Sequence, residues 1–282
     1  KLVARVEAEW RGIAITIYAK DALGDEFQEW IQTRADSLNY YKGEAFSLSG
    51  EFLDATDETW DDVFLTPTNE AALKRIATLV NTKGAAMENR GVILTGLPGT
   101  GKTLGVRILR NETPGVTFIW VSARDFYRSG AFGGIDQAFQ IAKDCAPSIL
   151  VFEDVDNWIG RGEIDLLKTT MDGVGRSKGI VTILTTNDPE HVPPALIDRP
   201  GRFHDVLKVD LPDASARTRM LARWAPELTP DIAKATVTAT DGYSGAHVRE
   251  LARFAGIIRE QEGIEPADKA MELALVKLRE QR

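Results

Sequence analysis

The stretch GLPGTGKT, residues 96–103, determines which fold the sequence can build, because it fits G-x-x-x-x-G-K-[ST] at every fixed position. The short apolar run Val92–Leu94 precedes it, and the helical pattern Leu104–Leu109 follows it. A glycine-rich turn from a strand into a helix presents backbone N–H groups and the positive end of a helix, which together bind phosphate. The stretch therefore predicts a phosphate-binding loop in an α/β domain.

This loop predicts ATP and Mg²⁺ as cofactors. We expect Lys102 to reach the β- and γ-phosphates and the hydroxyl of Thr103 to bind Mg²⁺. The expected cofactor-binding residues of the loop are Gly96, Leu97, Pro98, Gly99, Thr100, Gly101, Lys102, Thr103 and Leu104. The alternative is a glycine-rich turn with an incidental lysine, and the complete motif between a strand and a helix favours the phosphate loop.

Two carboxylates follow the apolar run of ILVFEDVD, residues 149–156. Acidic groups at the carboxyl end of a strand lie where α/β proteins bind their ligands. We therefore expect Glu153 to be a metal ligand together with Thr103, and Asp154 to polarise the attacking water. The alternative is a solvated acidic turn after a strand.

Two further polar motifs follow. The stretch IVTILTTN, residues 180–187, places Asn187 at a strand end, where it can hydrogen-bond the γ-phosphate and the water. Asparagine at a strand end is otherwise a common turn residue. Arg199 and Arg202 flank a Pro-Gly turn. A guanidinium on the transferring phosphoryl group can raise the rate by roughly 10³ to 10⁵, whereas the alternative is two surface arginines paired with acids.

Short apolar runs alternate with helical patterns from about Thr66 onward. The runs are Gly91–Thr95, Phe118–Val121, Ile149–Phe152 and Ile180–Thr185. This alternation predicts a parallel sheet with helices on both faces. From Ala214 the pattern is helical only, which predicts a small helical lid domain after the sheet.

The first residues have a different pattern. Residues 12–18 and 44–53 alternate between apolar and polar positions, and residues 23–39 have helical spacing, which predicts a short α+β N-terminal module. The expected domains are this module of unknown role at 1–55, a large α/β nucleotide-binding domain at 56–210, and the helical lid domain at 211–282.

The composition is that of a soluble globular protein, with 43% apolar and 27% charged residues among 282. The net charge of −8 provides no general basic field for nucleic acid. The single Cys145 cannot form a disulfide within the chain, which suits the cytoplasm or another reducing compartment. No apolar run is long enough for a membrane segment. Because the chain begins with Lys1 rather than Met, we expect it to be a fragment of a longer protein.

Together these motifs resemble the AAA ATPase family over about Asp54–Leu278. GLPGTGKT is similar to its Walker A motif, ILVFED to its Walker B motif, and Asn187 to its sensor 1. Arg199 and Arg202 resemble its arginine fingers, which act on the ATP of the adjacent subunit. The resemblance therefore implies a homo-oligomer, expected to be a hexamer.

The resemblance also implies further site residues. Asp62 and Val63 resemble the segment against the adenine, and Gly245 and Ala246 resemble the lid segment that closes over the base. Residues 172–174, Asp-Gly-Val, look like the inter-subunit signalling turn.

Family members that thread polypeptide carry an aromatic residue in a loop after the second strand. Phe132 is the corresponding candidate for a pore loop, with Tyr127 as the alternative. The other possibility is that both rings pack under the sheet.

Two positions differ from the family pattern. The acidic pair runs Glu-Asp rather than Asp-Glu, so the strand end must shift to compensate or hydrolysis is slow. Arg249 lies where wider relatives have a phosphate-contacting arginine, and it is equally compatible with a helix-surface residue. The Glu-Asp order and the stretch around Asn187 look most similar to the mitochondrial translocase that exports the folded Rieske iron–sulfur protein.

The function implied by the resemblance is coupling of ATP hydrolysis to remodelling, unfolding or translocation of a protein substrate. One alternative is a nucleic-acid motor or loader of the wider group. Another is a nucleotide-gated scaffold that hydrolyses slowly, which the shorter Asp154 supports. The three histidines, His191, His204 and His247, form no HExxH protease motif in this sequence.

Overall fold

The structure is a computed structural model. It describes residues 3–9, 12–18, 29–30, 33–34, 38–128, 133–174, 178–188, 190 and 203–280. The chain divides into two compact units, Lys1–Tyr40 and Tyr41–Arg282. Among the described helices, none combines the length and the apolar character that a membrane crossing requires.

The first unit contains an antiparallel hairpin. Strand β1 (Val3–Glu9) pairs with β2 (Gly12–Tyr18) over its whole length, from Val3 opposite Tyr18 to Glu9 opposite Gly12. The alternating pattern of residues 12–18 predicted β2. Most of the helix expected at 23–39 lies outside the described residues.

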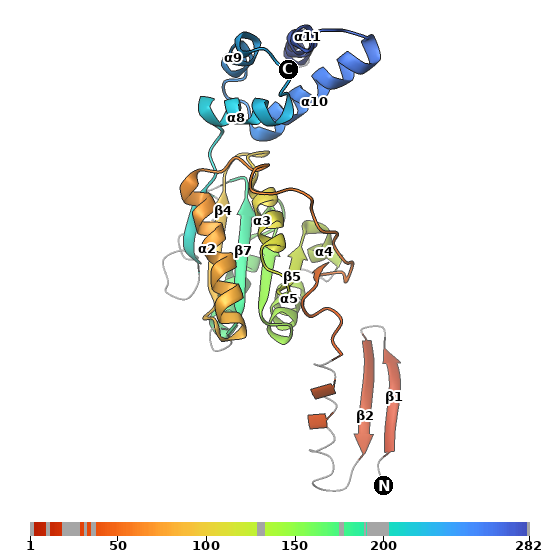
Figure 1. The fold of residues 1–282 in the computed structure, drawn as a ribbon. Coiled ribbons are helices and arrows are strands. Elements are labelled where there is room, and N and C mark those ends of the chain that lie inside the picture. Colours follow the sequence, from red (N-terminus) through yellow and green to blue (C-terminus); the bar gives the residue numbers. More distant parts are fainter. Residues whose placement is uncertain are drawn as a thin grey trace. The chain divides into compact units, whose positions relative to one another are not determined.

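The second unit is built on a six-stranded sheet with the order β3-β5-β6-β7-β4-β8, and every pairing in it is parallel (Figure 1). Its strands are β3 (Ala45–Ser47), β4 (Arg90–Thr95), β5 (Thr117–Val121), β6 (Ser148–Phe152), β7 (Ile180–Thr186) and β8 (Phe203–Lys208). The four apolar runs are β4 to β7, so the predicted parallel sheet is confirmed.

Both edge strands differ from the prediction. Residues 44–53 were assigned to the N-terminal module, but β3 pairs with β5, with Ala45 opposite Phe118 and Ser47 opposite Trp120. An alternating pattern indicates a half-buried strand and carries no information about which sheet the strand joins. Strand β8 was not predicted, because its sequence FHDVLK mixes charged and apolar residues. In the structure its Val206 is exposed.

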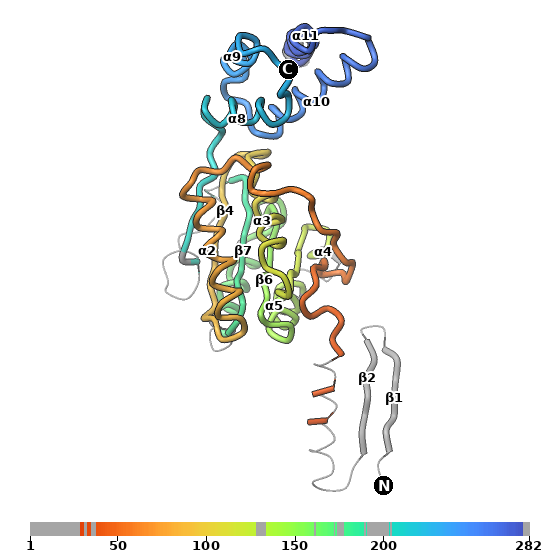
Figure 2. The backbone as a smooth tube through the Cα atoms, viewed as in Figure 1, coloured from red at the N-terminus to blue at the C-terminus, as the bar shows by residue number. Residues whose placement is uncertain are grey.

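Helices cover both faces of the sheet, as the sequence predicted. Side chains alternate along each strand, so Val92 and Leu94 face one core cluster while Ile93 faces the other. The first cluster contains side chains from α2 (Pro67–Lys83) and α3 (Lys102–Asn111). The second contains side chains from α5 (Gly133–Asp144) and α6 (Arg161–Val174). Figure 2 follows the chain through these layers.

Short helical segments connect these elements. They are the single turns η1 (Gly84–Ala86) and η2 (Val155–Asn157) and the short helix α4 (Ala123–Arg128). Segment η2 directly follows the acidic pair, so it sets the direction in which the chain leaves the end of β6.

After β8 the chain is helical, as predicted. The helices are α8 (Ala214–Trp224), α9 (Pro230–Ala239), α10 (Gly245–Glu262) and α11 (Ala267–Glu280). They share a hydrophobic core of their own, in which Leu221, Val248 and Met271 are fully or almost fully buried.

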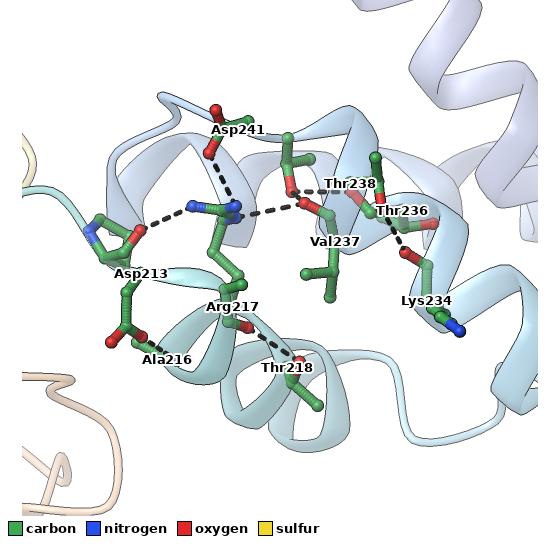
Figure 3. A network of polar contacts seen from close by, with 12 residues as sticks. Asp213, Ala216, Arg217, Thr218, Lys234, Thr236, Val237, Thr238 and Asp241 are labelled. Carbon is green, nitrogen blue, oxygen red and sulfur yellow. Dashed lines mark hydrogen bonds and ion pairs between the residues drawn. The ribbon is translucent and has the colours of Figure 1, made fainter.

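A buried arginine joins the first two lid helices (Figure 3). Arg217 is 5% exposed, and its guanidinium donates to the carbonyl oxygens of Pro212 at 2.7 Å and Val237 at 3.3 Å. It also donates to Oδ1 of Asp241 at 2.9 Å. A buried guanidinium is tolerated where its N–H groups have acceptors, so this contact set specifies how α8 and α9 pack.

Candidate nucleotide site

The phosphate loop leaves β4 at Thr95 and enters α3 at Lys102. A Cβ atom on Gly96 would lie 2.1 Å from the carbonyl oxygen of Val209, so only glycine fits there. Gly99 has φ +75°, and a Cβ on it would lie 2.7 Å from Oγ of Ser244. The loop is thus a tight backbone cradle against which the start of α10 packs.

Lys102 lies inside this cradle and is 5% exposed. Its ammonium group donates to the carbonyl oxygens of Gly96 at 2.6 Å and Leu97 at 3.0 Å, and to Oδ1 of Asn187 at 2.9 Å. Burial lowers the pKa of Lys102, and the nearby carboxylates of Asp154 and Asp156 partly oppose this. The two predicted residues Lys102 and Asn187 are therefore in direct contact.

The two predicted metal ligands also meet. The hydroxyl of Thr103 donates to Oε1 of Glu153 at 2.8 Å, and the indole N–H of Trp120 donates to Oε2 at 2.8 Å. A hydroxyl and a carboxylate are hard oxygen ligands of the kind that Mg²⁺ prefers. The donor set at this point of the loop therefore fits Mg²⁺.

Asp154 has an unusual backbone. Its φ of +47° makes it the only non-glycine residue with positive φ in the described part of the chain. Such strain is concentrated at functional sites. Burial raises the pKa of Asp154, the charges of Glu153 and Asp156 raise it further, and Lys102 lowers it. The carboxylate predicted to act on water therefore holds its proton more tightly than an ordinary aspartate.

Asn187 links three charged groups. Besides accepting from Lys102, its amide Nδ2 donates to Asp154 at 3.3 Å and to Asp156 at 3.5 Å. Its backbone N–H donates to Oδ1 of Asp156 at 2.9 Å. The ends of β6 and β7 thus share one polar network, because these strands are neighbours in the sheet.

Asp156 was missed by the sequence analysis. Burial alone would raise its pKa, but hydrogen bonds from the backbone and amide of Asn187 and from Thr186 lower it overall. This carboxylate fixes the position of Asn187. The sequence signal for it is the third acidic residue of VFEDVD, residues 151–156, which lies beyond the strand end.

The remaining candidates lie on the other side of the loop. The backbone N–H of Ala246 donates to the carbonyl oxygen of Gly99 at 3.0 Å, so the start of α10 contacts the loop directly. Val63 is buried beside the loop, where a Cβ on Gly101 would lie 3.1 Å from its Cγ2. Asp62 pairs with Arg223 of α8 at 3.0 Å. The backbone N–H of Thr59 lowers the pKa of Asp62, and Arg223 adds to this effect.

These groups surround one cavity of about 410 Å³. Its wall includes residues of the loop, of the strand ends and of the lid, among them Asp62, Val63, Pro98, Gly99, Thr100, Gly101, Lys102, Thr103, Leu104, Asp154, Asn187, Gly245, Ala246 and Arg249. The cavity has a cation and backbone donors at the loop and apolar groups near the lid, so its chemistry fits a nucleoside triphosphate.

Arg249 contributes to the wall of this cavity. It pairs with Glu58 at 3.2 Å, and its guanidinium lies 6.0 Å from the centre of the Trp224 ring. The side chain is 57% exposed, as a helix-surface residue would be, yet it lines the cavity, as a phosphate-contacting arginine would. A contact with phosphate stays a prediction.

Three predicted residues, Arg199, Arg202 and Phe132, lie outside the described residues. Tyr127 is described, and it is 66% exposed near the end of α4, with its ring edge-on to Phe126 at 5.9 Å. The alternative that its ring packs under the sheet is therefore wrong for Tyr127; the neighbouring Phe126, at 1% exposure, lies in the core instead. Residues 172–174 form the end of α6.

Comparison with known proteins agrees with this geometry. Residues 92–211 match the model of the ATPase family associated with various cellular activities (AAA). The ATP-dependent zinc metalloprotease FtsH of Hahella chejuensis is 36% identical over 200 residues, which is 63% of this chain and 31% of the relative. FtsH 1 of Symbiobacterium thermophilum is 35% identical over 193 residues, 62% of this chain and 32% of the relative. The chloroplastic or mitochondrial FTSH 11 of Arabidopsis thaliana is 33% identical over 191 residues, 62% of this chain and 23% of the relative.

This chain thus spans about a third or less of the length of these relatives. The similarity to the Rieske-protein translocase stays a prediction. The matched residues 92–211 contain the phosphate loop, the acidic pair and Asn187, which the structure brings together. Residues 92–211 of this chain therefore form a domain of the AAA ATPase family.

Proposed function

We propose that this chain binds Mg-ATP in the cavity beside the phosphate loop and hydrolyses it. We further propose that it works as a homo-oligomeric ring, a hexamer, that remodels, unfolds or translocates protein substrates. The observation that carries the proposal is the convergence of Lys102, Asp154, Asn187 and the start of α10 on one cavity.

Each side chain has a separate role in the proposed reaction. Lys102 and the loop N–H groups would bind the phosphates, and Asn187, which accepts a hydrogen bond from Lys102, would contact the γ-phosphate and the attacking water. Thr103 and Glu153 would hold Mg²⁺, which supplies charge neutralisation at the phosphate oxygens. Asp154 would accept a hydrogen bond from the attacking water and orient it.

The proposal of a protein substrate rests on the relatives and on charge. The three relatives above are named ATP-dependent proteases, and proteases act on proteins. The net charge of −8 disfavours a nucleic-acid track, because phosphate backbones are bound by clustered Lys and Arg. The exposed ring of Tyr127 offers an aromatic contact for an extended chain.

A second candidate is the slowly hydrolysing, nucleotide-gated scaffold. The observation that favours it is Asp154, which is one methylene shorter than the usual catalytic glutamate. The shorter side chain places its carboxylate further from the attacking water. A steady-state assay of phosphate release separates the two candidates, since the scaffold would bind ATP and release little phosphate.

The test of the proposed function uses two variants of the whole chain. Lys102→Ala should lose ATP binding, and Asp154→Asn should bind ATP and fail to hydrolyse it. Binding is measured with a fluorescent ATP analogue and turnover by phosphate release. Normal turnover of Asp154→Asn would place the catalytic carboxylate elsewhere, and stimulation by DNA or RNA instead of unfolded protein would favour the nucleic-acid motor.

A further inference from the structure

Glu153 is held at both of its carboxylate oxygens and at its backbone. Oε1 accepts from Thr103 and Oε2 accepts from the indole of Trp120, each at 2.8 Å. The backbone N–H of Glu153 donates to the carbonyl oxygen of Val121 at 3.0 Å, and its own carbonyl accepts from the indole of Trp158 at 2.8 Å. The carboxylate orientation is therefore set by Thr103 of α3 and Trp120 of β5.

Trp120 is itself held rigidly. It lies on β5 directly opposite Val151 of β6, and its side chain is 9% exposed in the core cluster beneath α2 and α3. A side chain packed in this way has little rotational freedom. Its indole N–H therefore presents a fixed donor at the edge of the metal site.

Glutamate needs such a donor more than aspartate does. It has one more methylene, so its carboxylate can reach more positions and loses more rotamer entropy when it is fixed. An indole N–H is a neutral donor and has no acceptor capacity. It can hold one carboxylate oxygen and leave the negative charge available to a metal ion on the other side.

The structure shows which groups could compete for the carboxylate of Glu153. Trp120 and Glu153 line a second cavity of about 480 Å³, whose wall includes Arg107, Arg110 and Arg124. A carboxylate released by Trp120 could turn toward these guanidinium groups, because charge-assisted pairs are stronger than a bond to a neutral donor. It would then lie away from Thr103.

We propose that Trp120 is a positioning residue of the nucleotide site, whose indole N–H holds one oxygen of Glu153 so that the other remains beside Thr103 for the magnesium ion. The inference rests on the proposed function and deepens it. It also gives a physical reason why this chain can use glutamate at the first acidic position.

The test compares Trp120→Phe with Trp120→His in the full chain. Both replacements are smaller than tryptophan, but histidine keeps a five-membered ring with an N–H two bonds beyond Cγ, where the indole has its own. At pH 8 the imidazole is neutral, since its ordinary pKa is about 6.5. The pair therefore separates the loss of the donor from the loss of ring volume.

We expect Trp120→Phe to raise the Mg²⁺ concentration for half-maximal ATP hydrolysis by about 10- to 100-fold, the usual effect of removing a partner of a metal ligand. ATP binding in EDTA should stay at the wild-type level. Trp120→His should recover most of the Mg²⁺ affinity. If both variants require the same Mg²⁺ concentration as the wild type, or both lose affinity equally, the inference is wrong.

Two controls keep this test decisive. A wild-type protein that hydrolyses no ATP would overturn the proposed function, whereas normal wild-type turnover with an unaffected Trp120→Phe would overturn only the role of Trp120. If neither variant folds, the indole N–H of Trp120 is followed by NMR in ¹⁵N-tryptophan wild-type protein. Its resonance should shift when Mg²⁺ is added to the ATP-bound protein, and an unchanged resonance would contradict the inference.

Discussion

The ammonium group of Lys102 donates a hydrogen bond of 2.9 Å to the amide oxygen of Asn187, although 85 positions separate them in the sequence. The contact exists because β4 and β7 are parallel neighbours, so the loop after one and the residue after the other lie at the same edge of the sheet. Asn187 donates through its nitrogen to Asp154 at the same time. A single amide therefore connects the phosphate-binding cation with the proposed catalytic carboxylate.

This connection predicts the effect of Asn187→Ala. ATP binding should change little, because the loop and Lys102 remain, while the turnover number should fall by about 10² or more, as when one positioned donor is removed from a reacting group. Phosphate release under saturating ATP measures the turnover number, and a fluorescent analogue measures binding. A variant that binds weakly but turns over normally would contradict the role given to Asn187.

The raised pKa of Asp154 predicts a gain in stability for Asp154→Asn. Because the folded pKa lies above the ordinary value of 3.8, the folded state is penalised when the carboxylate is charged. The penalty is fully present above the folded pKa and disappears as the pH falls below the unfolded value. We therefore expect Asp154→Asn to raise the Tm near pH 8 and to leave it unchanged near pH 3.

The control for this prediction is Asp165→Asn. Asp165 is 73% exposed on α6, where it pairs with Lys168, and a surface pair of this kind contributes little. Thermal unfolding of both variants at several pH values makes the comparison. A stabilisation of Asp154→Asn that does not depend on pH would mean that its charge is not the cause.

The sequence predicted the parts of the site that are coded by local pattern. The glycines of residues 96–101 are required by backbone geometry that only glycine fits, and buried strands are recognisable by their apolar runs. Contacts made by tertiary packing were not predictable. The bond from Trp120 to Glu153 and the one from Asn187 to Asp156 each depend on which strands are neighbours. The edge strand β3 was misassigned for the same reason.

Arg199 and Arg202 give a prediction about assembly. If they act on the ATP of the adjacent subunit, Arg199→Ala and Arg202→Ala should each lower turnover by roughly 10³ to 10⁵ without weakening ATP binding. Mixing Arg199→Ala with Asp154→Asn should restore part of the activity, because some neighbouring copies then combine an intact arginine with an intact carboxylate. Absence of any recovery at concentrations where the ring forms would argue against action between subunits.

The buried Arg217 predicts a stability difference within the lid (Figure 3). Arg217→Met keeps much of the side-chain volume but leaves the carbonyl oxygen of Pro212 without this donor, whereas the carbonyl oxygen of Val237 still accepts from the hydroxyl of Thr240 at 3.2 Å. Since one buried group without a partner costs about 1 to 3 kcal/mol, we expect a loss of about 1 to 3 kcal/mol. Urea unfolding followed by far-UV circular dichroism measures this loss.

Asp241→Asn is the matched control for Arg217→Met. The Asp241 side chain is 86% exposed, so water can replace the interaction, and a loss of at most about 1 kcal/mol is expected. Equal losses for the two variants would show that the ion pair, rather than the bonds to carbonyl oxygens, stabilises the packing of α8 against α9.

Gly99 predicts how closely the lid must approach the phosphate loop. In Gly99→Ala the new Cβ would lie 2.7 Å from Oγ of Ser244 and 2.8 Å from Cβ of Ala246, so the start of α10 must move away. That movement breaks the bond from the Ala246 N–H to the Gly99 carbonyl oxygen and opens the cavity wall. ATP affinity should therefore fall.

Gly115→Ala is the control for Gly99→Ala. Gly115 has nearly the same φ as Gly99, +77° against +75°, and no atom lies within 4 Å of its Cβ position. It should lose about 1 to 2 kcal/mol of stability from backbone strain and keep wild-type ATP affinity. Equal affinity for ATP in both variants would mean that the contact between α10 and the loop is not needed for binding.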